Sequence, residues 1–150
     1  RFAPDAPEAM EIYAECGRLG LPIVFHAGRA GIEPESSHGF AVARHYEPML
    51  AEFPDVEFVL GHAGARDVEG MLPIAKRHPN AWLEIHGQGL TTLGTLLAEL
   101  GPERLLFGTD WPFYHLGATL AKVLLVTRDR PDAREAILRG NALRLLQRHA

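Results

Sequence analysis

The sequence predicts an α/β fold in which four consecutive βα units form the C-terminal half of an eight-unit (β/α)8 barrel. Short apolar runs alternate with stretches whose apolar residues recur every three or four positions, which is typical of parallel strands joined by helices. The runs are apolar at nearly every position, as strands covered on both faces are. The chain has 150 residues, and a complete barrel needs about 250.

The elements are placed by their length and by the Gly or Pro residues that bound them. The runs at 21–25, 56–61, 81–85 and 104–109 are predicted to be strands. Helices are predicted over 7–19, 40–53, 67–77 and 90–100, with a further helix from Asp132 and a short final one from Asn141. A Rossmann-type open sheet is the alternative, but no glycine-rich phosphate fingerprint follows any predicted strand.

Composition excludes several classes of protein. Hydrophobic residues make up 47% and charged residues 23%, which is typical of a globular chain. The net charge of −4 offers no basic surplus for a nucleic acid, and the apolar runs are far shorter than a membrane span. The single cysteine, Cys16, excludes an internal disulfide framework. We therefore expect a cytoplasmic protein that acts on a small-molecule substrate without nucleic-acid or membrane partners.

The sequence starts at Arg1 and shows no charged-then-apolar leader. We expect residues 1–150 to be a partial domain, with the first half of the barrel upstream. A half barrel has two open strand edges, which promote association with other chains. The 150 residues alone are therefore predicted to be inactive, and either homo-oligomeric or poorly stable.

Polar residues with metal-binding side chains follow all four predicted strands. His26, His62 and His86 directly follow the first three runs, and Asp110 directly follows the fourth. Functional residues of (β/α)8 barrels collect at the carboxyl ends of the strands. A lone histidine there is more often a core or loop residue, but burying several such groups together without a function is costly. Imidazole and carboxylate groups at one barrel mouth predict a site for a first-row metal.

Several segments resemble the amidohydrolase-related (amidohydrolase 2) family of TIM-barrel, metal-dependent hydrolases. They are Leu-Pro-Ile-Val-Phe-His-Ala-Gly at 21–28, Leu-Gly-His-Ala-Gly at 60–64, Leu-Phe-Gly-Thr-Asp-Trp-Pro at 106–112 and the helical tail at 137–146. The resemblance extends in order over nearly the whole chain. It implies that the four strands are strands five to eight of the barrel.

The resemblance also implies roles for individual residues. His26 matches a histidine that ligates the metal, and His62 matches a histidine that acts as a catalytic acid or base. Asp110 matches an aspartate that contacts the metal and accepts a proton from the attacking water. One divalent metal is implied, with zinc favoured over manganese. The family's His-x-His pair on the first strand has no match here, and we expect it upstream of Arg1.

Other positions leave alternatives open. His86 stands where the family often has a small hydroxyl residue, so it is either a substrate contact or a structural histidine. Arg44 belongs to the segment 29–45, which either closes on an anionic substrate or is a solvated surface loop. Trp111 either contacts substrate at a pocket wall or packs its loop against the next helix.

The function expected from these residues is hydrolysis of a small carboxylated lactone, ester or amide by a metal-activated water. Asp110 would take the proton of that water, and His62 would stabilise or protonate the oxyanion. Ala27-Gly28 after His26 replaces the His-Pro common in the family's decarboxylases, which favours hydrolysis. The alternatives are non-oxidative decarboxylation of an aromatic or related acid at the same site, and a non-catalytic half barrel.

Overall fold

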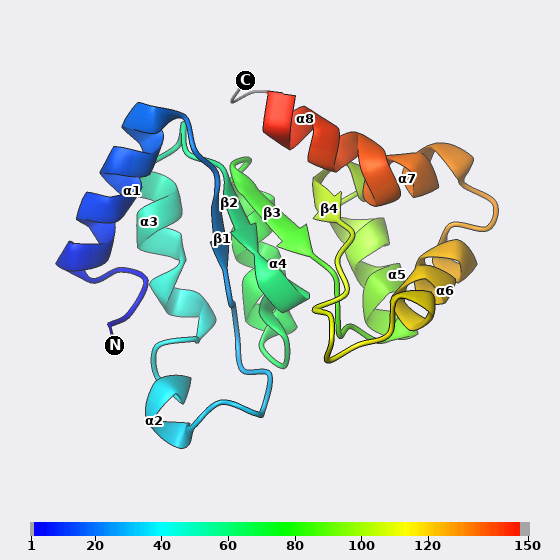
Figure 1. The fold of residues 1–150 in the computed structure, drawn as a ribbon, viewed down its shortest axis with the longest axis horizontal. Coiled ribbons are helices and arrows are strands. Elements are labelled where there is room, and N and C mark those ends of the chain that lie inside the picture. Colours follow the sequence, from blue (N-terminus) through cyan, green and yellow to red (C-terminus); the bar gives the residue numbers. More distant parts are fainter. Residues whose placement is uncertain (1, 148–150) are drawn as a thin grey trace.

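The computed structural model describes residues 2–147, which fold around one parallel sheet in the strand order β1-β2-β3-β4 (Figure 1). The strands are β1 (Ile23–Phe25), β2 (Phe58–Leu60), β3 (Ala81–Glu84) and β4 (Leu105–Leu106). Each lies within a predicted run and is shorter than that run. Consecutive strands pair in parallel, so all four carboxyl ends lie at the same edge of the sheet. The predicted half-barrel fold of four βα units is confirmed.

Most of the predicted helices are present. The longer helices are α1 (Pro7–Leu19), α4 (Val68–Arg77), α5 (Leu90–Glu99) and α6 (Leu116–Val126). The shorter elements are α2 (Glu35–His38), η1 (Ala43–His45), α3 (Glu47–Glu52), η2 (Gly61–Gly64) and η3 (Pro102–Arg104). The tail consists of α7 (Pro131–Glu135), a π-helical turn η4 (Ala136–Gly140) and α8 (Asn141–Gln147).

Two of these helices differ from the prediction. The single helix predicted over 40–53 is wrong: the segment holds η1 and the short helix α3. Pro48 lies in the first turn of α3, where a missing N–H is tolerated, whereas in a helix interior it would break the hydrogen-bond ladder. Helix α6 was not predicted, because its apolar residues are not confined to one stripe.

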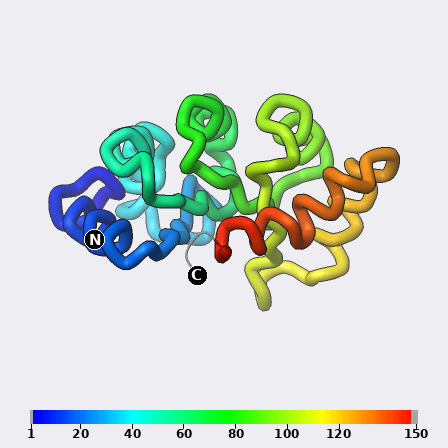
Figure 2. Tube along the Cα trace, turned by 90° about the horizontal axis from the view of Figure 1, so that it is seen from above, coloured from blue at the N-terminus to red at the C-terminus, as the bar shows by residue number. Residues whose placement is uncertain are grey.

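The sheet separates two apolar layers. Helices α3, α4 and α5 lie on one side of it and α8 on the other (Figure 2). The layer under α8 contains Val59, Trp82 and Leu106, which cluster with Leu145 of that helix. Val24 pairs with Val59 in the sheet, yet the residue is 72% exposed. None of the helices within residues 2–147 is long and apolar enough to span a membrane.

The edge of the sheet at β4 is covered, so the expectation of two open edges is wrong there. The side-chain amide of Asn141 donates to the carbonyl oxygen of Leu105 at 2.7 Å. The backbone N–H of Phe107 donates to the carbonyl oxygen of Ile137 at 3.2 Å. Asn141 is fully buried. The helical tail therefore satisfies backbone groups that an edge strand would otherwise expose. Strand β1 forms the opposite edge of the sheet.

Candidate metal centre

The four strand ends bring three imidazoles and a carboxylate into one continuous cluster. Nε2 of His62 lies 3.0 Å from Nδ1 of His26 and 3.2 Å from Nε2 of His86. Nε2 of His86 lies 3.5 Å from Oδ2 of Asp110. The side chains predicted to converge at the carboxyl ends of the strands therefore do so.

Part of this cluster has the geometry of a metal site. Ligand atoms of His62, His86 and Asp110 all lie within 4.8 Å of one another. Both histidines are buried and the aspartate is partly buried, whereas His26 is exposed and touches the cluster through His62. Two imidazole nitrogens and one carboxylate oxygen are a donor set typical of catalytic zinc, which leaves a further position for water or substrate. The residues present thus fit a divalent cation.

The loop that carries His62 has an unusual backbone. His62 and Ala63, within η2, and Ala65 after it have φ of 57°, 48° and 48°, in the left-handed region that costs a non-glycine residue about 1 to 3 kcal/mol. The side-chain amide of Gln88 donates to the carbonyl oxygens of His62 and Ala65, which holds this conformation. Asp110 also has a positive φ, 52°. Strained residues persist where the surrounding structure fixes them, often at functional sites.

The surroundings keep His62 neutral. Burial, followed by the positive charge that His86 and His26 carry when protonated, lowers the pKa of His62 to about 4. Its imidazole therefore carries no charge at pH 7. A neutral imidazole is the form that binds a metal.

A carboxylate that we did not predict lies directly behind the cluster. Oε1 of Glu84 accepts from the backbone N–H of His86 at 2.8 Å, and Oε2 accepts from the backbone N–H of His62 at 3.3 Å. Oε2 also contacts Nδ1 of His86. The sequence carried a signal for this residue: an acidic side chain inside an apolar strand, two positions before His86, lies on the same face of that strand.

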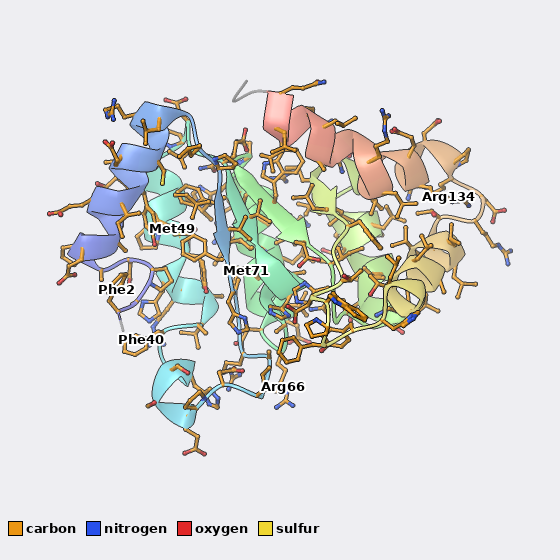
Figure 3. The ribbon with its side chains drawn as sticks, in the orientation of Figure 1. Phe2, Phe40, Met49, Arg66, Met71 and Arg134 are labelled. Carbon is orange, nitrogen blue, oxygen red and sulfur yellow. The ribbon has the colours of Figure 1, made fainter. Side chains whose placement is uncertain are left out.

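A cavity of about 250 Å³ opens beside the imidazoles. His62 and His86 line one part of it, and Arg66, Gln88 and Tyr114 line another. Arg66 follows the strained turn and projects beyond the carboxyl ends of the strands (Figure 3). Neither Arg66 nor Gln88 is among the residues predicted from the sequence.

Of the three residues that were predicted to contact substrate, only His86 lines the cavity. His86 is buried in the cluster, with 8% of its side chain exposed, and it also lines the cavity. Arg44 is exposed on η1, and Trp111 is 72% exposed. Neither is among the residues that line the cavity, whereas Tyr114 of the same loop as Trp111 is.

Comparison with known proteins gives relatives of the same fold. A gamma-resorcylate decarboxylase of Rhodococcus jostii is 27% identical over 155 residues, covering 75% of this chain and 46% of the relative. An uncharacterised TIM-barrel protein of Bordetella bronchiseptica is 28% identical, with a TM-score of 0.82 over 99% of this chain and 53% of its own. A dihydroxybenzoic acid decarboxylase of a Polaromonas species, solved with manganese and an inhibitor, is 19% identical, with a TM-score of 0.73 over 97% of this chain and 55% of its own.

The chain therefore spans about half the length of the proteins that it matches. The expected family is confirmed by a match that covers nearly all of the sequence. The family model described as amidohydrolase matches residues 2–148, so this chain belongs to the amidohydrolase family with a TIM-barrel fold.

Proposed function

We propose that this chain forms part of a metal-dependent, non-oxidative decarboxylase that acts on a small aromatic carboxylic acid. The observation that carries the proposal is the shared cavity, in which the imidazoles of His62 and His86 face the same space as Arg66 and Tyr114. The decarboxylases among its relatives favour this reaction over the hydrolysis that the sequence alone suggested. The size of the cavity suits a single-ring substrate.

The cation would be held by His62, His86 and Asp110. When bound, a divalent cation supplies positive charge that attracts and polarises the carboxylate or hydroxyl oxygens of the substrate. Imidazole and carboxylate donors suit both zinc and manganese. His26 would support His62 from the exposed side of the cluster, through the 3.0 Å contact between their ring nitrogens.

Arg66 and Tyr114 would bind the substrate. A guanidinium group at a cavity wall forms paired hydrogen bonds with a carboxylate. Tyr114 lies with its ring centre 6.0 Å from that of His86, so an aromatic substrate in the cavity would meet a π-surface. The carboxylate of the substrate would thus contact Arg66, and its ring would contact Tyr114.

The reaction needs one proton. The bond between the ring carbon and the carboxyl carbon breaks, carbon dioxide leaves, and the electron pair that remains on the ring takes up a proton. Asp110 has 33% of its side chain exposed, so it can exchange protons with water. Its contact with His86 keeps it within the cluster, and we assign proton delivery to it.

The test is release of carbon dioxide from dihydroxybenzoates by the protein loaded with manganese or zinc. We expect release that a chelator abolishes, and a KM at least about tenfold higher in Arg66→Gln, because the carboxylate would lose its cationic partner. Arg77→Gln is a matched control, because Arg77 pairs with Glu47 on the surface. Metal-loaded protein that hydrolyses lactones or esters and leaves every benzoate intact would refute the proposal.

Hydrolysis is the second candidate, and Ala27-Gly28 after His26 is the feature that favours it. In that case Asp110 would accept the proton of a water and His62 would assist the oxyanion. A panel of lactones, esters and amides, assayed beside the benzoates, separates the two reactions. A protein without metal and without either activity would instead support the non-catalytic half barrel.

We also propose that the first half of the barrel, with its His-x-His pair, lies upstream in a longer protein. Three donors meet the lower limit for a catalytic metal, and two more histidines would complete a stronger site. The affinity of the 150-residue chain for zinc, compared with that of a chain extended upstream, tests this. Equal affinity would contradict the proposal.

A further inference from the structure

The carboxylate of Glu84 contacts both the backbone and a ring nitrogen of histidines in the candidate metal centre. Glu84 ends β3, and its two oxygens accept from the backbone N–H groups of His86 and His62. Its Oε2 also meets Nδ1 of His86. Only 14% of the Glu84 side chain is exposed, and three donors from two adjacent strand ends converge on it.

The fold leaves room for this carboxylate. Gly108 lies on β4's continuation, next to Glu84, and a Cβ at that position would be 2.2 Å from Oε1. Any side chain at 108 would therefore displace the carboxylate. The backbone of Gly108 has no need of a positive φ, so the requirement for glycine here comes from the space that Glu84 fills.

The contact with Nδ1 decides which nitrogen of His86 carries the proton. A carboxylate accepts hydrogen bonds, so Nδ1 is the protonated nitrogen and Nε2 keeps its lone pair. That lone pair points into the cluster, where Nε2 lies 3.2 Å from Nε2 of His62 and 3.5 Å from Oδ2 of Asp110. The ring is thus oriented with its free lone pair toward the other two candidate ligands.

We propose that Glu84 is a positioning residue, which fixes the tautomer and orientation of His86 and so raises the affinity of the cluster for a divalent cation. Carboxylates that accept from a metal-binding histidine orient the ring and increase its basicity. The same carboxylate holds the backbone of His62, so one residue aligns both imidazoles. The inference rests on the metal site of the proposed function, but it requires nothing of the substrate.

The test compares Glu84→Gln with Glu57→Gln. Glu57 is a matched control because it is also a buried carboxylate, and it bonds to the indole N–H of Trp82. We expect Glu84→Gln to weaken zinc binding by about 10- to 100-fold in a competition titration, the range for loss of such a partner. In the metal-free protein, ¹⁵N NMR should show the His86 ring leaving the Nδ1–H tautomer. Glu57→Gln should change neither quantity.

A second variant covers the case in which Glu84→Gln does not fold. Gly108→Ala keeps the carboxylate but pushes it from its place, so it should shift the His86 tautomer and weaken zinc binding in the same direction. Unchanged zinc affinity and tautomer in a folded Glu84→Gln or Gly108→Ala protein would overturn the inference. So would an equal loss in Glu57→Gln. These readouts need no turnover, so they stay separate from the test of decarboxylation.

Discussion

Gly28 and Gly64 meet backbone to backbone, and this contact joins the loops that carry His26 and His62. A Cβ on Gly28 would lie 1.8 Å from the carbonyl oxygen of Gly64, closer than any pair of nonbonded atoms allows. Gly28 also has a φ of 79°, which disfavours any side chain. The approach of the two histidines therefore depends on glycine at 28.

Replacing Gly28 with alanine should lower the free energy of unfolding by about 3 kcal/mol or more, because backbone strain and overlap act together. Gly94→Ala is the control. Gly94 lies within α5 with open space where a Cβ would be, so alanine there should raise the free energy of unfolding by up to about 1 kcal/mol. Chemical denaturation of both variants measures the difference. A Gly28→Ala protein as stable as Gly94→Ala would show that the loops do not need this contact.

Asparagine substitutions can distinguish the histidines that bind the metal from those that do not. The geometry brings ligand atoms of His86, His62 and Asp110 within 4.8 Å of one another, whereas the family resemblance implied His26 as a ligand. His86→Asn should therefore lose more zinc than His26→Asn, measured by elemental analysis after dialysis against a limiting chelator. His78→Asn, beyond the end of α4, should retain its metal. The reverse order for His86 and His26 would support the assignment based on the resemblance.

The role of Asp110 predicts a large effect on turnover. Asp110→Asn keeps the size of the side chain but removes its charge and most of its basicity. Activity of the full-length protein should fall at least about a hundredfold, the usual scale for a positioned proton transfer. Metal content must be measured with the rate, because Asp110 is also a candidate ligand. Full activity in a metal-loaded variant would remove Asp110 from proton transfer.

The lowered pKa of His62 predicts a pH dependence of stability in metal-free protein. The pKa of His62 in the folded protein is about 4, below the ordinary histidine value of 6.5. Between these two values the unfolded chain binds a proton that the folded chain does not, so the free energy of unfolding should fall as the pH drops from 6.5 to 4. Above pH 6.5 the contribution is fully present.

Denaturation curves in the presence of a chelator, from pH 7 to pH 4, measure this effect. The wild-type protein should lose more stability over that window than His62→Asn, whose side chain does not titrate. Parallel curves for the two proteins would mean that His62 protonates with equal ease in the folded and unfolded states.

Much of the fold follows from local patterns in the sequence. Runs that are apolar at nearly every position, with glycine or proline at their ends, determined the four strands and their parallel order. Because parallel strands end at one edge, the placement of His26, His62 and Asp110 after three of them was enough to predict their convergence. The sequence also carried the family resemblance, since the motifs lie in order along the chain.

Other features depend on contacts between residues far apart in the chain, which no local pattern encodes. The covered edge at β4 depends on Asn141, 36 residues away from Leu105. The cavity depends on Arg66 and Tyr114, which line it together only when the loops after β2 and β4 are in place. Glu84 would be read as an isolated charge in an apolar strand until the fold brings the N–H groups of His62 and His86 to its oxygens. Strand periodicity determined which face each side chain occupies, but only tertiary packing decided its partners.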